Sequence, residues 1–275
     1  MKQLNYKLIV SDFDGTLLSS KYDISDEVKS AINDFVENGG IFAVVTGRML
    51  KSILPQVRAL GLKGFVCAYQ GTVIADIESG KIIKEGGFPA ENVAEICRAI
   101  KDCGQFINVY YDNNLYTDIP KENEHLKLYE KITGVDAISI TDIPMADYVL
   151  KNKMYCQKVT SLVSPKEMLN LYNALYERFH DKYDVTYSAS VLVELSPKGD
   201  DKGSALRFLS EKYGIPIEKC VAIGDSLNDA PMIKVAGLGV AVENAVQPLK
   251  DIANYVTVSN DEGAVAQVIK KFGYK

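Results

Sequence analysis

Two aspartates, Asp12 and Asp14, stand two residues apart directly after a short apolar run at residues 8–10. Such a run is typical of a buried strand, and two carboxylates just past its end can point into the same space. This arrangement suits a divalent metal ion and leaves one carboxylate oxygen able to attack an electrophile. Acidic pairs are also common in surface turns, so the interpretation depends on what other loops supply.

Three further segments carry polar side chains where a strand ends or a helix begins. They are Thr46, Gly47 and Arg48 after the apolar run at 41–45, Asp225, Ser226, Asn228 and Asp229 after the run at 220–223, and Lys202 at the start of a helical segment. Ligands of open parallel sheets bind beyond the carboxyl ends of the strands. We therefore expect these residues to meet Asp12 and Asp14 in one crevice.

The combined residue types fit phosphoryl transfer, which needs a nucleophile, a metal ion, charge neutralisation and positioning. Asp12 is the expected nucleophile and would form an aspartyl phosphate. Asp14 is expected to protonate the leaving alcohol and then to activate water. Asp12, Asp14 and Asp225 would form an oxygen-only metal site, which suits Mg²⁺ better than Zn²⁺.

Hydroxyl, amide and cationic groups are expected to bind the phosphate and the rest of the substrate. These residues are Thr16, Thr46, Gly47, Arg48, Lys202 and Asn228, supported by Asp229 and Ser226. Lys202, at a helix N-terminus, would offset the negative charge of the transferring phosphoryl group. Asp229 would hold this lysine in place. Taken singly, each residue also fits an ordinary turn, helix cap or solvated surface position. Chance is a poor explanation of all of them together and in order.

Strands and helices alternate in the first and last thirds of the chain and are expected to position these loops. The expected strands are 8–10, 41–45, 65–68, 220–223, 238–242 and 255–258, and the expected helices are 25–38, 49–60, 202–213, 230–235 and 263–272. Apolar strands separated by helices predict an α/β fold with a parallel sheet covered on both faces.

The middle of the chain predicts an α+β insert instead of more parallel sheet. Its expected helices are 90–103 and 164–179, and its expected strands are 106–111, 115–117, 148–150, 155–162 and two pieces within 184–195. We therefore expect a core domain formed by residues 1–84 and 191–275, and an inserted domain formed by residues 85–190.

The composition and charge of the chain argue against several classes of protein. The chain has 275 residues and a net charge of -5, and no basic stripe favours nucleic acid. Its 5 cysteines are odd in number and form no Cys-x-x-Cys pair, which indicates a reducing, cytoplasmic compartment. No signal peptide or apolar run long enough to cross a membrane is evident. We expect a monomer or a weak homo-oligomer.

The four loops resemble the motifs of the haloacid dehalogenase (HAD) superfamily phosphatases, in particular the Cof-type hydrolases with a class IIB cap. The matching segments are 12–16, Thr46, Lys202 and 224–229, and the tail at 243–263 also resembles the Cof group. The resemblance covers nearly the whole chain. It implies a Rossmann-like core with a cap inserted between the second and third motifs, and a Mg²⁺-dependent phosphatase of small phosphorylated metabolites, with sugar phosphates the expected class.

Two segments depart from the Cof pattern. Gln70-Gly71-Thr72 stands where Asn-Gly-Ala is frequent, and Val242-Glu243-Asn244-Ala245 stands where Met-Gly-Asn-Ala is common. Both departures leave the motif residues unchanged but alter the rim of the site. Candidate cap residues for recognising the leaving group are polar or aromatic, namely Tyr110, Asn113, Asn114, Tyr116 and Lys153.

Two other functions remain open from the sequence. A phosphomutase or phosphotransferase on the same scaffold would pass the phosphoryl group to a sugar hydroxyl instead of water. A non-enzymatic phosphometabolite sensor or phospho-acceptor domain would not release phosphate catalytically. No P-loop or Gly-x-Gly-x-x-Gly pattern supports nucleotide-driven or dinucleotide chemistry.

Overall fold

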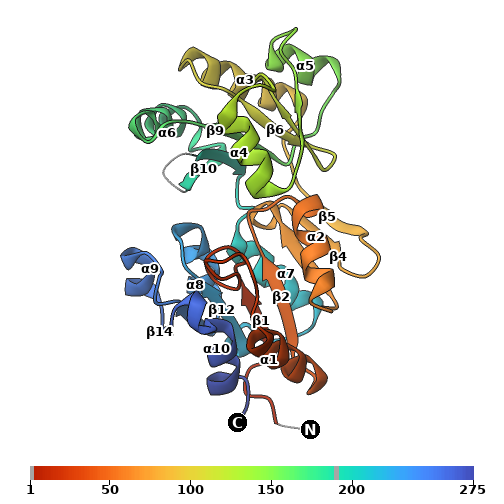
Figure 1. Cartoon of the computed structure of the whole chain (residues 1–275), viewed down its shortest axis with the longest axis vertical. Helices are drawn as coiled ribbons and strands as arrows, with labels where there is room; N and C mark the ends of the chain where they lie inside the picture. Colours follow the sequence, from red (N-terminus) through yellow and green to blue (C-terminus); the bar gives the residue numbers. More distant parts are fainter. Residues whose placement is uncertain (1–2, 189–191) are drawn as a thin grey trace. The chain divides into compact units, whose positions relative to one another are not determined.

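The computed structural model of the chain describes residues 3–188 and 192–275, and it contains two compact units (Figure 1). The core unit comprises Met1–Gly47, Leu54–Ile83 and Asp201–Lys275, and the insert unit comprises Arg48–Ile53 and Lys84–Asp200. The insert unit thus extends ten residues beyond the predicted boundary at residue 190. The reason is that the last strand of the insert pairs with two other insert strands.

An eight-stranded sheet belongs mainly to the core unit. Its order is β14 (Tyr255–Val256), β13 (Leu238–Ala241), β12 (Cys220–Gly224), β1 (Leu8–Ser11), β2 (Ile41–Val45), β3 (Phe65–Ala68), β4 (Val73–Asp76) and β5 (Ile82–Glu85). The six strands from β14 to β3 are parallel, and β4 returns antiparallel to β3. The predicted parallel sheet is confirmed, whereas the hairpin of β4 and β5 was not predicted.

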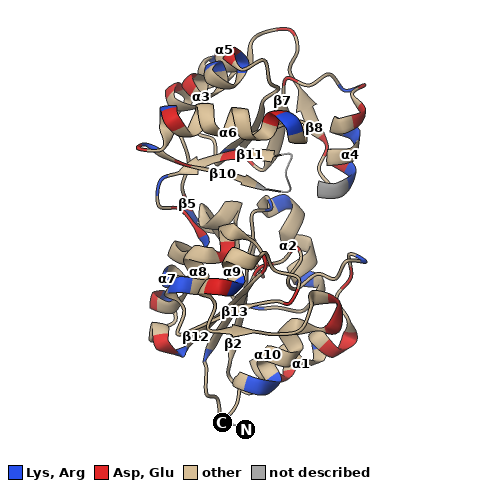
Figure 2. Cartoon of the chain, turned by 90° about the vertical axis from the view of Figure 1, so that its left-hand side faces the viewer, with Lys and Arg blue, Asp and Glu red and all other residues tan. Residues whose placement is uncertain are grey.

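Helices cover both faces of this sheet, as the buried apolar strands require. They are α1 (Asp26–Glu37), α2 (Leu50–Ala59), α7 (Lys202–Lys212), α8 (Ala230–Val235), α9 (Gln247–Ile252) and α10 (Ala264–Phe272). Helix α1 packs against α10 on one face, and α7 packs against α8 on the other (Figures 1 and 2). Because β1 and β12 are neighbours at the centre, the loops that follow them lie side by side.

The N-terminus of α7 is fixed by a reciprocal cap. The Asp201 carboxylate accepts a hydrogen bond from Ser204 N–H at 2.7 Å, and Ser204 Oγ accepts one from Asp201 N–H at 3.2 Å. These bonds satisfy backbone donors that the first turn of a helix leaves unpaired. The cap therefore sets where α7 begins, and Lys202 is its first residue.

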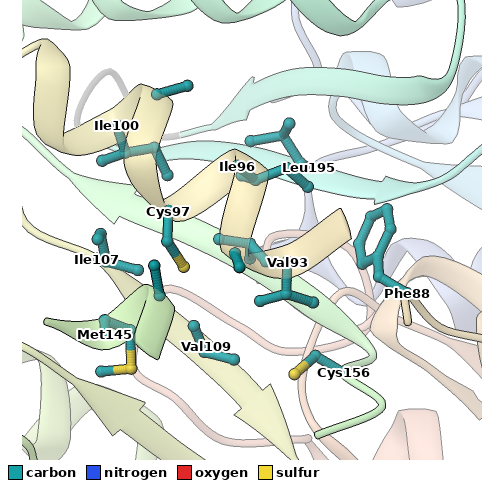
Figure 3. Packing of buried hydrophobic residues seen from close by; sticks show 14 of the residues in the cluster. Phe88, Val93, Ile96, Cys97, Ile100, Ile107, Val109, Met145, Cys156 and Leu195 are labelled. Carbon is teal, nitrogen blue, oxygen red and sulfur yellow. The ribbon is translucent and has the colours of Figure 1, made fainter. Parts of the chain in front are cut away.

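The insert unit is an α+β structure with its own six-stranded sheet. The order is β10 (Tyr183–Ser188), β11 (Leu192–Pro197), β9 (Lys158–Leu162), β6 (Asn108–Tyr111), β7 (Asn114–Thr117) and β8 (Ala137–Ser139), and only β7 and β8 pair in parallel. Its helices are α3 (Ala90–Asp102), α4 (Glu124–Thr133), α5 (Met145–Lys151) and α6 (Pro165–Phe179). A buried apolar cluster, which includes Ile96, Val109 and Leu195, forms its core (Figure 3).

The strand predicted at residues 148–150 is wrong, because this segment is the middle of helix α5. Met145 and Val149 are buried at helical spacing, and α5 packs against α3. Tertiary packing therefore overrides the β propensity of the tyrosine and valine here.

Charged residues of both signs are interspersed along the helices of both units (Figure 2). None of the helices described is long and apolar enough to cross a membrane. The 5 cysteines are all free thiols, and Cys67 in β3 and Cys220 in β12 are buried.

Replacing the α7 cap by Asp201→Ala should lower the free energy of unfolding by about 1 kcal/mol, because a backbone donor of the first turn loses its acceptor. Urea denaturation at constant m-value measures this change. Asp201→Asn is the matched control, since asparagine caps helices equally well. Equal stability of the alanine variant and the native chain would show that the cap does not fix α7.

Candidate active site

Asp12 lies directly after β1, where pairing on both sides of the strand fixes its backbone. Its N–H donates to Ile223 O of β12 at 2.9 Å, which extends the ladder between β1 and β12 by one residue. The side chain is almost fully buried, with 5% of its residue surface exposed. The first predicted carboxylate therefore sits at the centre of the sheet edge, next to the strand that leads to Asp225.

The ammonium group of Lys202 lies between two buried carboxylates. Its Nζ is 2.7 Å from Asp12 Oδ1 and 2.6 Å from Asp229 Oδ1. Lys202 is 1% exposed and Asp229 is 0% exposed. A buried ion is stable only where partners of opposite charge replace its water. Lys202 thus joins the loop after β1, the start of α7 and the loop after β12, and Asp229 holds the lysine as predicted.

Electrostatics in this triad keep the lysine charged. Burial alone would lower the pKa of Lys202, but the carboxylates of Asp12 and Asp229 outweigh burial and raise the pKa above its ordinary value. Burial also raises the pKa of Asp12 well above its ordinary value, and the nearby acids add to this effect while Lys202 opposes it. Three carboxylates, those of Asp12, Asp225 and Asp229, thus lie around a single ammonium group, and a cation would relieve the excess negative charge.

The second oxygen of Asp229 organises the loop after β12. Asp229 Oδ2 accepts hydrogen bonds from Asp225 N–H at 2.8 Å and from Ser226 N–H at 3.0 Å. A Cβ atom at Gly224 would lie 2.5 Å from the Asp229 side chain, so only glycine fits where that side chain crosses the strand end. The Asp229 side chain makes no capping hydrogen bond to α8, so it does not serve as an ordinary helix cap.

Asp225 is held by two hydroxyl groups. Thr16 Oγ1 donates to Asp225 Oδ1 at 2.8 Å, and Ser226 Oγ donates to Asp225 Oδ2 at 2.8 Å. Gly15 has φ +76°, and a Cβ atom there would lie 2.9 Å from Asp225 Oδ2. Thr16 is 1% exposed and its single hydroxyl hydrogen is directed to Asp225. Its hydroxyl therefore orients a carboxylate, and the predicted contact of Thr16 with phosphate stays a prediction.

Among the residues described, Asp12, Asp225 and Asp229 form a group of acids whose ligand oxygens lie within 4.8 Å of one another. Both carboxylate oxygens of Asp229 already accept hydrogen bonds, one from Lys202 and the other from two backbone N–H groups. Asp12 and Asp225 are therefore the better candidate ligands for a metal ion. A donor set made only of oxygen suits Mg²⁺. Asp14 is exposed and is not part of this group, so its predicted place among the metal ligands stays a prediction.

The remaining predicted residues occupy the neighbouring loops. Thr46 is buried after β2, with its N–H donating to Cys67 O at 2.9 Å, and Gly47 follows it half-buried. Asn228 lies in the loop after β12 and donates from Nδ2 to Gln70 Oε1 at 3.3 Å. Arg48 is half-buried and groups with the insert unit, so its predicted contact with an anionic substrate stays a prediction.

Two of the candidate recognition residues of the insert, Tyr110 and Asn114, make local structural contacts. Tyr110 is 3% exposed, and its hydroxyl shares a hydrogen bond with the hydroxyl of Tyr129. Asn114 donates from Nδ2 to Asp112 O at 2.9 Å, at the β6–β7 turn. These two contacts are explained by packing and turn formation alone.

Two residues that support the site, Asn244 and Asn260, were not identified as supporting residues from the sequence. Asn244 Nδ2 donates to Gly15 O at 2.9 Å, which ties the tail to the loop after β1. Asn260 Nδ2 donates to Leu18 O at 2.9 Å, and its N–H donates to Asn244 Oδ1 at 3.0 Å. The resemblance of the tail to the Cof group was the available signal, but it did not indicate which atoms the tail contacts.

Known proteins similar to this chain are hydrolases and phosphatases. Residues 9–269 match the haloacid dehalogenase-like hydrolase family. A Bacillus subtilis protein named phosphatase YwpJ is 31% identical, with 96% of this chain and 99% of the relative covered. The B. subtilis 5-amino-6-(5-phospho-D-ribitylamino)uracil phosphatase YcsE is 27% identical over 98% of this chain and 96% of the relative. A haloacid dehalogenase-like hydrolase from Bacteroides thetaiotaomicron has a similar structure, with a TM-score of 0.84, 30% identity and coverage of 97% and 99%.

Replacing the buried cation by Lys202→Met should lower the free energy of unfolding by about 3–5 kcal/mol, because Asp12 and Asp229 would stay buried without a counterion. Chemical denaturation measures the change. Lys234→Met in α8 is the matched control, because Lys234 is exposed and its loss should cost less than about 0.5 kcal/mol. Similar stability of the two variants would contradict the role of Lys202 as the link between the loops.

Proposed function

The chain belongs to the haloacid dehalogenase-like hydrolases and is a phosphatase, and we propose that it hydrolyses phosphate monoesters of small metabolites through a phosphoryl group carried on Asp12. The observation that carries the proposal is the position of Asp12 at the centre of the sheet edge, in contact with Lys202 and close to the Asp225 carboxylate. A carboxylate in this setting is an oriented nucleophile next to positive charge.

In the first step, an Asp12 carboxylate oxygen forms a bond to phosphorus while the bond from phosphorus to the leaving oxygen breaks. Asp14 gives its proton to that leaving oxygen, which departs as an alcohol. Lys202 offsets the negative charge that spreads over the phosphoryl oxygens during transfer.

In the second step, water attacks phosphorus and the bond from phosphorus to Asp12 breaks. Asp14, now a carboxylate, accepts a proton from that water, so inorganic phosphate leaves and both aspartates return to their starting states. Thr46, Gly47 and Asn228 are the proposed contacts for the phosphoryl oxygens. Thr16 and Ser226 act through Asp225, which they orient.

Asp12 and Asp225 are the proposed protein ligands of a magnesium ion. When bound, Mg²⁺ would neutralise charge on the phosphate and polarise it toward attack. Burial and the Asp229 carboxylate raise the pKa of Asp225, although its bonds from Thr16 and Ser226 oppose this. Both proposed ligands thus sit where the ionised form benefits from a cation.

The proposed substrates are small phosphorylated metabolites, with sugar phosphates as the expected class. The relative named for a phosphorylated ribityl compound acts on a molecule of this kind, which supports the proposal. A panel of phosphorylated metabolites, read as released phosphate, tests it. Formation of phosphosugar isomers without free phosphate would support the phosphomutase alternative instead. The proposed location is the cytoplasm.

Asp12→Asn should lower kcat for a generic phosphomonoester by at least about 1000-fold while the protein stays folded, because the amide oxygen is a poor nucleophile. Steady-state release of phosphate and a thermal melt measure the two effects. Asp26→Asn, at an exposed carboxylate of α1, is the matched control and should retain full activity. Native activity in the Asp12 variant would exclude Asp12 as the nucleophile.

Removal of divalent ions by chelation should abolish activity, and added Mg²⁺ should restore it. Asp225→Asn should raise the Mg²⁺ concentration for half-maximal activity by roughly 10-fold or more, because one charged ligand is lost. Titration of Mg²⁺ by calorimetry gives a readout that is independent of turnover. Full activity after chelation, or an unchanged Mg²⁺ titration in the variant, would contradict the proposed metal site.

A further inference from the structure

The short 3-10 helix η1 (Tyr69–Gly71), which follows β3, lies against two loops of the proposed active site. Gln70 N–H donates to Thr46 O at 2.9 Å. On the other side, a Cβ atom at Gly71 would lie 2.7 Å from Asp201 O, so η1 is packed closely against the cap of α7. Gln70 is therefore placed between the segment that ends in Thr46 and the helix that begins with Lys202.

The side chain of Gln70 reaches two residues proposed to bind phosphate. Its Oε1 accepts a hydrogen bond from Asn228 Nδ2 at 3.3 Å. Its Nε2 is close to Gly47, since a Cβ atom added there would lie only 2.7 Å from Nε2. The Gln70 amide thus fills the space between Gly47 and Asn228, with its carbonyl toward Asn228 and its amino group beside Gly47.

Two polar atoms of this pair of amides lack a partner within the described part of the chain. Gln70 is half-buried, and the one hydrogen bond that its side chain makes with the described residues is at Oε1. Asn228 Oδ1 is buried and has no hydrogen-bond partner. The Nε2 hydrogens of Gln70 can donate to an acceptor beside Gly47. Asn228 Oδ1 is itself an acceptor, so it needs a donor or a cation and cannot pair with a phosphoryl oxygen.

The backbone of η1 is held in an unfavourable conformation. Gln70 has φ 61° and Tyr69 has φ 51°, followed by Gly71 at φ 106°. Left-handed conformations suit glycine and asparagine better than glutamine. Strained residues cluster at functional sites, because the surrounding structure keeps a side chain there for its chemistry. A glutamine at this position is therefore better explained by its side chain than by its backbone.

We propose that Gln70 is a further substrate-binding residue, whose Nε2 donates a hydrogen bond to a phosphoryl oxygen while its Oε1 orients Asn228. The chemical class recognised is a tetrahedral oxyanion, either the phosphate of the monoester or the inorganic phosphate product. The inference rests on the proposed function, because it needs the phosphoryl group to bind beside Gly47 and Asn228. Gln70 would supply an uncharged hydrogen-bond donor to the phosphoryl group, in addition to the positive charge of Lys202.

Two variants separate a donor to phosphate from a purely structural side chain. Gln70→Glu has the same shape and keeps an oxygen that can accept from Asn228, but it loses both Nε2 hydrogens. Gln70→Met has a similar length and also lacks the donor, but it carries no charge that would repel phosphate. Gln267→Glu in α10 is the matched control, because Gln267 is exposed in the core unit.

The affinity for inorganic phosphate is measured by calorimetry in the presence of Mg²⁺, together with KM and kcat for para-nitrophenyl phosphate and a thermal melt. Both Gln70 variants should bind phosphate about 10-fold more weakly or worse and show a raised KM, the size of effect expected when a hydrogen bond to a charged group is lost. The control should match the native chain. If Gln70→Met melts early, Gln70→Leu replaces it as the uncharged variant without a donor.

Native phosphate affinity and KM in Gln70→Glu would overturn the proposal, because that variant preserves the contact with Asn228. Native affinity in a folded Gln70→Met would also overturn it, since the loss in Gln70→Glu would then come from charge repulsion. Measurements on the native chain separate failure of the Gln70 proposal from failure of the proposed phosphatase function. If it releases phosphate and binds the product, the phosphatase stands whatever the Gln70 variants show.

Discussion

The arrangement of the site depends on one buried cation, the Lys202 ammonium between the Asp12 and Asp229 carboxylates. A buried charge is stable only when a group of opposite charge lies next to it. The three side chains therefore depend on one another for their electrostatic stabilisation. They come from the end of β1, the start of α7 and the loop after β12, which are distant in sequence. The parallel sheet brings their backbones together, and the Lys202 interaction fixes their side chains.

The other contacts extend outward from this triad. Asp229 uses its second oxygen to shape the backbone that presents Asp225, and Thr16 returns from the first loop to orient the same carboxylate. Glycines at positions 15 and 224 are required because a Cβ atom there would collide with these carboxylates. The geometry around Asp12 is therefore prepared before substrate binds, which is how a site lowers the cost of charge reorganisation during phosphoryl transfer.

The sequence predicted the parallel sheet and most of its helices because apolar runs and caps are local signals. It also predicted the pairing of Lys202 with Asp229. The roles of Thr16, Gln70 and Asn244 could not be predicted, because each depends on a contact with an atom far away in the chain. The segment at 148–150 was predicted as a strand because its residue types outweighed a helical burial pattern that only packing against α3 reveals.

The stereochemical course at phosphorus tests the account most directly. Attack by Asp12 followed by attack of water makes two in-line displacements, each of which inverts the configuration. Hydrolysis, in ¹⁷O-labelled water, of a phosphorothioate monoester made chiral at phosphorus with ¹⁶O and ¹⁸O should therefore release chiral thiophosphate with overall retention. Overall inversion would mean that water displaces the alcohol in a single step, and it would contradict the proposed role of Asp12 as the group that carries the phosphoryl.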